Sequence, residues 1–389
     1  MLLAFLTLIV SSVNAAIDRY SVVSRYNPTR NASSPTTPMQ IGNGNFAFGT
    51  DVTGLQTFQP FAIMSSWGWK NDSLPPGKTM EDVLDYQGES WYNHGRLVEY
   101  DFGGDPLIEQ WLISNPNRVN LGRVGLAFLS SAGQVLDVTE TNLTDIQQSL
   151  DLWNGIITSK FSFQNVPITI ETVCAQTADT VGVNITSSLL QQGRLAVFLD
   201  FPWNDGTNKF SDPYVGSFNA SLAANHTTTV VIDKLGAQIN HTLNTATFIT
   251  SVGGDGFDIT RDSPLLHRYT IRPTEQSASF SLSIDYGLSS PQTILPPSAI
   301  RSSSISAWAQ FWTQSAFVDL AEGSTDQRAN ELQRRVILSR YLMRVNEAED
   351  TPPQEVGASN SLLVYLTYSV RTCQRWLGTS KSSASELVQ

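Results

Sequence analysis

Apolar and polar residues alternate with a period of two along most of the chain, from about Met39 to Tyr286. This alternation is typical of β-strands that bury one face and expose the other. In the clearest case, serine and aspartate alternate with four apolar residues, Phe280, Leu282, Ile284 and Tyr286. The pattern predicts a strand with one buried face.

Other segments predict paired strands. In IITSKFSF, Ile157, Phe161 and Phe163 share one face, and Ile168 and Ile170 share a face after the turn at QNVP, so this pair predicts a hairpin. The same pattern recurs in three further segments, 124–128, 230–232 and 247–250. Many strands in series, separated by Gly, Asn, Asp and Pro, predict a mainly β fold with a large antiparallel sandwich over residues 17–288.

The period changes after this region. The polar residues and paired prolines of SSPQTILPPSA predict a linker over residues 289–300. Beyond it, over residues 301–389, apolar residues recur at helical spacing, first at Ile305, Trp308, Phe311 and Trp312. The segment 332–345 predicts a helix that is apolar over most of its circumference, so we expect neighbours on nearly every side. Either the sandwich covers it or part of a helical domain is missing. A further amphipathic helix is expected after Asn360.

The first 16 residues, MLLAFLTLIVSSVNAA, predict a signal peptide, because an apolar run is followed by small residues at a possible cleavage site. The run is too short to span a bilayer, which takes about 20 residues. We therefore expect a secreted, extracellular protein that does not insert in a membrane. Sequons of the form Asn-x-Ser/Thr predict glycosylation, although a Ser/Thr-rich chain also produces them by chance. They lie at Asn31, Asn71, Asn142, Asn184, Asn219, Asn225 and Asn240.

Charge and composition restrict the partners. The formal net charge is −11 and no basic stripe is present, which argues against nucleic acid and fits a neutral oligo- or polysaccharide. The histidines are scattered without ligand spacing, so the sequence predicts no metal and no cofactor. Cys174 and Cys373 permit one disulfide or none. The oligomeric state stays open.

Five blocks of sequence, in order, resemble fungal and bacterial six-hairpin glycosidase-like proteins. The blocks are MQIGNGNFAFGTDVTGLQTF at 39–58, SSWGWKNDSLPPGKTMEDV at 65–83, GESWYNHGRLVEYDFGG at 88–104, LIEQWLISNPNRVNLGRVGL at 107–126 and LQRRVILSRYLMRVNEAEDTPPQE at 332–355. The resemblance implies an antiparallel β-supersandwich joined by a linker to an (α/α)6 barrel. It also implies inverting cleavage of a glycosidic bond, with a glutamate of the barrel as general acid and, in the hydrolases, a second carboxylate that activates water, the two roughly 6.5–9.5 Å apart.

The chain departs from the family's pattern at Val356, and residues 361–389 replace the segment that opens the barrel. No position matches the barrel's catalytic glutamate, so the resemblance assigns no catalytic residue here. We therefore expect a short helical stub of the barrel and an inactive, shortened form of a secreted glycoside hydrolase. The alternative is a non-catalytic carbohydrate-binding β-sandwich. The sugar, linkage and anomer stay open, as does the choice between hydrolase and phosphorylase.

Aromatic side chains next to polar ones are the candidate sugar-binding residues, because flat rings pack on the C–H faces of sugars. Two clusters qualify, and their members are Trp67, Trp69, Trp91, Tyr92 and His94. The alternative for each tryptophan is a place in the sandwich core or at a domain interface. A further loop at residues 200–210 contains Trp203, Asn204 and Asp205.

Overall fold

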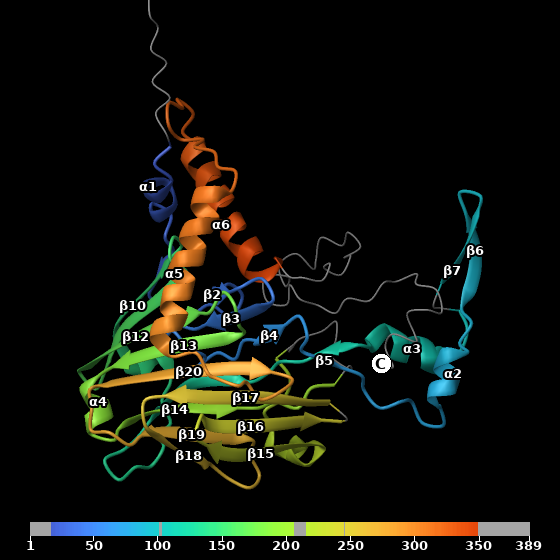
Figure 1. The fold of residues 1–389 in the computed structure, drawn as a ribbon, viewed down its shortest axis with the longest axis horizontal. Coiled ribbons are helices and arrows are strands. Elements are labelled where there is room, and N and C mark those ends of the chain that lie inside the picture. Colours follow the sequence, from blue (N-terminus) through green and yellow to red (C-terminus); the bar gives the residue numbers. More distant parts are fainter. Residues whose placement is uncertain (1–16, 101–102, 206–214, 245, 349–389) are drawn as a thin grey trace, which may run out of the picture.

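The computed structural model describes residues 17–100, 103–205, 215–244 and 246–348. Within them the fold consists mainly of antiparallel β-sheets with a few helices, which confirms the predicted fold class of a β-sandwich followed by a short helical segment (Figure 1). The predicted signal peptide, the tail after residue 348 and Cys373 lie outside the described residues, while Cys174 is buried in the core.

The larger sheet has nine strands. In spatial order they are β1 (Thr29–Arg30), β10 (Leu143–Asp151), β11 (Ile156–Phe163), β12 (Val166–Cys174), β13 (Thr180–Thr186), β20 (Ser279–Gly287), β17 (Ala246–Gly254), β16 (Gly236–Leu243) and β15 (His226–Asp233). Every pair of neighbours in this sheet is antiparallel.

A four-stranded sheet packs against it. Its strands are β18 (Phe257–Arg261), β19 (Arg268–Pro273), β14 (Leu195–Asp200) and β9 (Arg123–Phe128). The smaller sheets are β2 (Met39–Gly42), β3 (Phe46–Thr50) and β4 (Met64–Ser65), then β5 (Trp69–Lys70) with β8 (Asn117–Arg118), and β6 (Glu89–Asn93) with β7 (Arg96–Tyr100).

The α-helices are short, except for two. They are α1 (Arg19–Ser24), α2 (Met80–Leu84), α3 (Pro106–Ser114), α4 (Ser188–Gln191), α5 (Pro297–Gln314) and α6 (Ala329–Asn346), with 3-10 turns η1 (Glu140–Asn142) and η3 (Ala220–Asn225). Because α5 begins at Pro297, its first turn lies inside the predicted linker; proline at a first helical position is favourable. No described helix is long and apolar enough to cross a bilayer.

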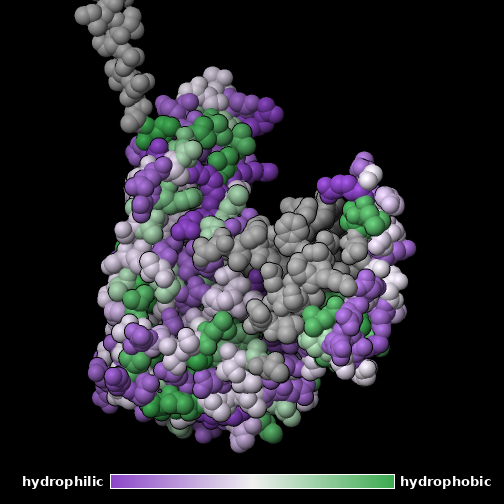
Figure 2. Space-filling view, turned by 45° about the vertical axis from the view of Figure 1, so that its right-hand side comes forward, coloured by the Kyte–Doolittle hydropathy of each residue, from purple (hydrophilic) through white to green (hydrophobic). Residues whose placement is uncertain are grey.

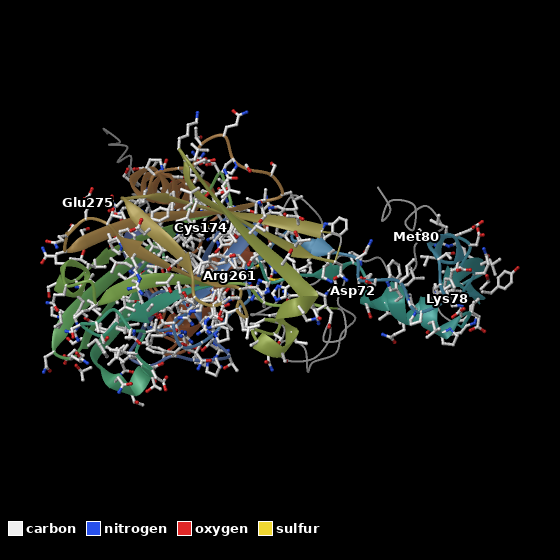
Figure 3. The ribbon with its side chains drawn as sticks, turned by 90° about the horizontal axis from the view of Figure 1, so that it is seen from below. Asp72, Lys78, Met80, Cys174, Arg261 and Glu275 are labelled. Atoms are coloured by element: carbon white, nitrogen blue, oxygen red, sulfur yellow. The ribbon has the colours of Figure 1, made fainter. Side chains whose placement is uncertain are left out.

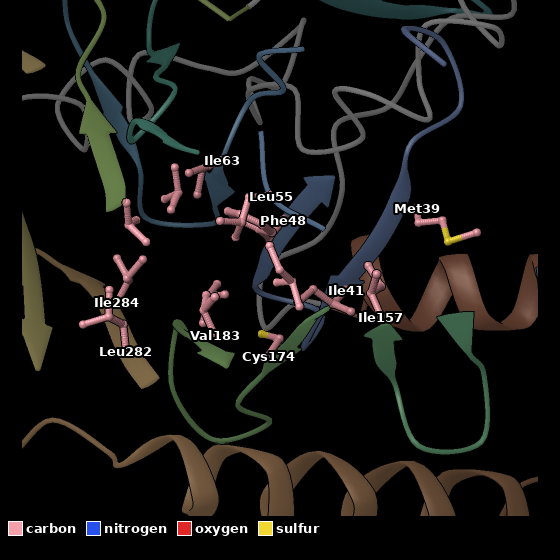
Figure 4. Packing of buried hydrophobic residues seen from close by; sticks show 14 of the residues in the cluster. Met39, Ile41, Phe48, Leu55, Ile63, Ile157, Cys174, Val183, Leu282 and Ile284 are labelled. Atoms are coloured by element: carbon pink, nitrogen blue, oxygen red, sulfur yellow. The ribbon is translucent and has the colours of Figure 1, made fainter. Parts of the chain in front are cut away.

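The main core lies between the layers. The nine-stranded sheet contributes Ile157, Val183, Leu282 and Ile284, which face side chains of the β2–β4 layer such as Phe48 (Figure 4). The predicted strands at 124–128, 157–170 and 280–286 are confirmed as β9, the hairpin β11–β12 and β20.

The turn of the β11–β12 hairpin shows why this pair forms. Gln164 and Asn165 both have positive φ, 51° and 63°, which is the backbone of a type I′ turn. Phe161 then stands opposite Ile168, so their side chains share the buried face. A two-residue turn of this kind matches the twist of the strands it connects.

Helix α6 corrects one expectation. One stripe of the helix is buried, at a spacing of four residues, and it consists of Gln333, Ile337, Tyr341 and Val345; Asn346 at the end of the helix is buried as well. Leu332 and Met343 are 53% and 55% exposed, so the sandwich covers one side of the helix and not nearly every side. The segment 332–345 also contains arginines, and these lie on the remaining faces of the helix. The buried stripe packs on β2 and β3, and the Tyr341 hydroxyl donates to the Gln40 carbonyl oxygen at 3.0 Å.

Residues 74–114, here called the arm, project from the sandwich (Figures 1 and 2). Their small core is separate from the main one and consists of Val83, Ile108, Trp111 and Leu112, with Leu74, Met80 and Tyr86 packed against it. Helices α2 and α3 form the base of the arm, and the hairpin β6–β7 forms its tip.

A pair of glycine substitutions tests the packing of α5 on the sandwich. Gly155 and Gly133 both have left-handed φ, 66° and 76°, where alanine costs roughly 1–2 kcal/mol. At Gly155 an added Cβ would also collide with the Trp308 indole, whereas Gly133 is open. We expect Gly155→Ala to lower the free energy of unfolding by about 1–3 kcal/mol more than Gly133→Ala, measured by urea denaturation. Equal losses would show that α5 does not dock as described.

Candidate functional site

Trp67 is turned into the sandwich. It lies between β4 and β5, and its indole nitrogen Nε1 donates a hydrogen bond of 2.8 Å to Asp179 Oδ2. Its ring packs against the main core, with its centroid 6.3 Å from that of Phe248. The side chain is partly buried and is therefore poorly placed to offer a flat face to a ligand.

The Asp179 carboxylate is the centre of this contact. Besides Trp67, it accepts a hydrogen bond from Asn43 Nδ2 at 3.0 Å and one from Ser65 Oγ at 2.5 Å. These donors come from the β2–β3 turn and from β4, so one side chain connects the layers at this end of the sandwich. Sequence reasoning missed Asp179, because nothing in the local segment QTADT distinguishes it.

Trp69 and Lys70 point in opposite directions from β5, as successive strand residues do. Trp69 is 39% exposed, and Lys70 is buried. The Lys70 ammonium group forms an ion pair with Asp72, donates to Asn244 Oδ1 at 2.9 Å and lies 5.5 Å from the centre of the Trp203 ring. The buried charge is therefore compensated from several sides, and the exposed indole lies on the other side of the strand.

The loop after β14 is held by its own polar groups. Trp203 pairs with Ser217 in an isolated bridge, and its indole nitrogen donates to Asp205 Oδ2 at 3.1 Å. Asn204 is buried, and its Oδ1 accepts from the Asn120 backbone nitrogen at 3.4 Å. Residues 206–214 of the predicted loop lie outside the described part of the chain.

The tip of the arm carries the other aromatic candidates. Trp91 pairs with Val98 and Tyr92 with Leu97 across the β6–β7 ribbon, so the two aromatic residues lie on opposite faces. Their exposed fractions are 47% and 79%. His94 lies at the turn with φ of 50°, next to Gly95 at 78°, and both are exposed.

The structure does not bring the two predicted clusters together. Trp67 and Trp69 belong to the end of the sandwich, whereas Trp91, Tyr92 and His94 lie at the tip of the arm. The chain passes from one to the other at Asp72 (Figure 3).

Hydrogen bonds hold the base of the arm against the segment at Asp72 and Ser73. The Trp111 indole nitrogen donates to the carbonyl oxygens of Asp72 and Ser73 at 3.1 and 3.2 Å, and the Asp72 nitrogen donates to Asn115 Oδ1 at 2.7 Å. Helix α3 and its C-cap residue Asn115 therefore hold the segment that leads into the arm.

Three of the four histidines lie in contact, although they are far apart in the sequence. His226 on β15 and His241 on β16 approach each other at 2.8 Å between Nδ1 and Nε2, and the His226 and His267 ring centroids are 3.9 Å apart. All three are buried. The sequence could not show this cluster, because strand pairing and sheet packing create it.

The tautomer of His267 follows from its neighbours. Its Nε2 lies 2.9 Å from the Ala223 carbonyl oxygen, which only accepts, so Nε2 carries the proton. Its Nδ1 then accepts from Thr228 Oγ1 at 2.8 Å, and Thr228 Oγ1 in turn accepts from the Tyr269 hydroxyl at 2.8 Å. His267 is therefore held as the neutral ring.

Burial disfavours the charged form of every member of this cluster. It lowers the pKa of His226 to about 3, with repulsion from His267 and Arg261 adding to the effect. It also lowers the pKa of His241 well below the ordinary range, and His226 adds to that shift. The pKa of His267 is lowered by burial as well. The cluster is a neutral packing unit at neutral pH.

Metal binding finds no support in the described residues. Within them, no group of three or more His, Cys, Asp or Glu side chains is arranged to hold a metal ion. The buried carboxyl of Asp51, whose pKa is raised by burial, is held by four donors from Thr53, Phe58 and Gln59. This carboxyl group stabilises the turn after β3 and has no exposed oxygen to offer a ligand or a reacting bond.

The sequons fall into two groups. Asn31, Asn142, Asn219 and Asn225 are exposed, whereas Asn71, Asn184 and Asn240 are half-buried. Asn184 and Asn240 lie in strands β13 and β16, inside the nine-stranded sheet. Glycosylation itself stays a prediction, and the exposed group is where a glycan has room.

Comparisons with known proteins gave structural similarities only. No family model matches the chain, and no curated protein matches it by sequence. The fold is similar to a structure described as a kojibiose phosphorylase from the human microbiome, with a TM-score of 0.39, 9% identity, and coverage of 82% of this chain and 39% of that one. It is also similar to a bacterial glucoamylase complexed with acarbose, with a TM-score of 0.31, 7% identity, and coverage of 79% and 41%. The chain spans about two fifths of the length of these structures.

The histidine cluster predicts a dependence of stability on pH. Because the folded pKa of His226 is lowered from 6.5 to about 3, the unfolded chain binds more protons between these values. The contribution to stability is therefore complete above pH 6.5 and is lost as the pH falls towards 3. We expect His226→Asn to reduce the slope of unfolding free energy against pH below 6.5 by up to about 1.4 kcal/mol per pH unit.

The measurement is urea unfolding at several pH values between 8 and 5. His94→Asn, in the exposed turn outside the cluster, is the control. An unchanged slope in His226→Asn would contradict the assignment.

Proposed function

We propose that this chain is a glycosidase-like, secreted β-sandwich protein that binds oligo- or polysaccharide through the aromatic tip of its arm. The observation that carries the proposal is the exposure of Trp91 and Tyr92 on a hairpin that projects from the sandwich. Both rings are accessible to a ligand, and tryptophan and tyrosine are enriched at binding surfaces because each combines a large apolar ring with a polar group. The five sequence blocks that resemble six-hairpin glycosidase-like proteins support the class of ligand.

The two faces of the hairpin offer different contacts. Trp91 and Val98 share one face, and Tyr92 and Leu97 share the other. On each face an aromatic ring lies beside an aliphatic side chain, which suits the apolar C–H face of a pyranose. Asn93 and Arg96, paired next to the turn, supply donors for sugar hydroxyl groups.

The end of the sandwich also has an exposed aromatic side chain next to a polar one. Trp69 is exposed and stands opposite Arg118 across β5 and β8. The Arg118 guanidinium donates to the Ser66 carbonyl oxygen, so its position is fixed. Trp69 is therefore the candidate for a second sugar contact at the end of the sandwich.

Calorimetric titration of the purified chain with a panel of neutral oligosaccharides tests the proposal. We expect Trp91→Ala and Tyr92→Ala each to weaken binding by about 5- to 100-fold, because stacking contacts contribute roughly 1–3 kcal/mol. Leu265→Ala, which removes an exposed apolar side chain elsewhere on the sandwich, is the matched control and should leave binding unchanged.

Absence of binding across the panel, or equal binding by Trp91→Ala and the unsubstituted chain, would refute the proposal. We propose further that this chain binds without cleaving, and a parallel assay for release of reducing sugar tests that part. Turnover that disappears when one of its own carboxylates is substituted would show catalysis instead.

A further inference from the structure

The outer face of the four-stranded sheet has a pocket that contains a cationic side chain, whereas the tip of the arm presents aromatic rings. Its volume is about 360 Å³, near the lower end of the range of about 300–1,000 Å³ that is common for small-ligand sites. Phe198 and Ala127, from β14 and β9, form its floor, and residues 135–138 form one wall. The main core lies on the opposite face of the same strands.

Arg268 is the cationic group of the pocket. Its guanidinium carbon lies 3.7 Å from the centre of the Phe198 ring, which is a stacked geometry, and its Nε lies 3.1 Å from Asp262 Oδ2. Nε is buried and, despite this distance, makes no hydrogen bond. The terminal nitrogens donate to no described residue either, and the side chain is 25% exposed. The ring therefore holds the guanidinium in place while its terminal N–H groups stay available.

Arg123, the neighbouring arginine, has a different role. Its Nε donates to the Gln56 carbonyl oxygen at 2.7 Å and its Nη2 to the Thr57 carbonyl oxygen at 2.6 Å. It fixes the backbone of the segment that forms another wall of the pocket. Arg272, on the same face of β19, donates through Nη2 to the Gly133 carbonyl oxygen at 3.3 Å. Of these three arginines, Arg268 is therefore the one available to a ligand.

We propose that this pocket binds a small organic carboxylate of monosaccharide size, such as a uronic acid, through the terminal nitrogens of Arg268. A planar guanidinium pairs with a carboxylate through two parallel hydrogen bonds, which suits a fixed, stacked arginine. The apolar floor accepts the C–H face of the ring. Asp137, exposed in the wall, repels the anion and keeps the affinity moderate. The site is independent of the arm and of the function proposed for it.

The surrounding charges add a pH dependence. Asp200 stands between Arg123 and Arg268 in cross-strand register, and Asp262 also faces this group. Burial raises the pKa of Asp200 to about 6, against the opposing effect of the two arginines. Between pH 7 and 5 Asp200 takes up a proton, so Arg268 loses a competing negative charge. Binding of an anion that stays ionised over this range should therefore tighten at the lower pH.

The test is a ligand-observed NMR titration of the full chain with sodium glucuronate, with glucose as the neutral probe and constant ionic strength. We expect glucuronate to bind, glucose to bind at least tenfold more weakly, and Arg268→Gln to weaken glucuronate about tenfold or more. Asp137→Asn should tighten it by about threefold. Arg301→Gln, which removes an exposed arginine on α5, should have no effect.

Two results overturn the proposal directly. One is that glucose binds as tightly as glucuronate, and the other is that no binding of glucuronate is detected. If Arg268→Gln does not fold, Asp137→Asn and Val135→Trp decide, because the tryptophan fills the pocket from an exposed wall position and should abolish binding. Asp200→Asn should remove the increase in glucuronate affinity between pH 7 and 5.

The proposal is contradicted if Val135→Trp still binds glucuronate. It is also contradicted if the affinity of Asp200→Asn still increases between pH 7 and 5. Loss of oligosaccharide binding in Trp91→Ala leaves this titration unchanged, so the two proposals fail separately.

Discussion

The fold depends on a mismatch in width between its two main sheets. One sheet has nine strands and the other four, so the smaller sheet covers only part of the apolar inner face of the larger. The β2–β4 layer covers the rest, and α6 covers that layer in turn through Ile337, Tyr341 and Val345. Burial of apolar surface at roughly 25 cal/mol per Å² drives all three layers together. The close approach of Gly42 to Val345 shows how little space is left between strand and helix.

This arrangement separates structural polar groups from groups available to ligands. Asp51 and Asp179 use their carboxylate oxygens to accept hydrogen bonds from surrounding turns, and the buried histidines are neutral and pack on one another. Most buried polar groups are paired, because leaving one unpaired costs roughly 1–3 kcal/mol. The available chemistry lies outside these layers, on the arm and on the outer face of the smaller sheet.

The sequence predicted the strands well where alternation is strict, as in β11, β12 and β20, because one face of each is buried and the other is polar. It also predicted α5, because apolar residues at helical spacing mark the face of that helix that is buried on the sandwich. It could not separate Trp67, which is packed on the core, from Trp91, which is exposed, because the difference lies in which layer each segment joins. The histidine cluster and the pairing of Arg268 with Phe198 were also invisible, since both join strands that are distant in sequence.

The arm has an energetic consequence of its own. Among its described residues, the core of the arm contains four buried apolar side chains, and an isolated two-stranded hairpin is marginally stable in water. Trp111 and Asn115 hold the base of the arm to the segment around Asp72, and Asn244 of the sandwich donates to Ser73 Oγ at 3.1 Å. Such a unit opens locally without unfolding the sandwich. Amide protons of β6 and β7 should then exchange with solvent far faster than those of β11 and β12, and the arm adjusts its orientation at little cost to global stability.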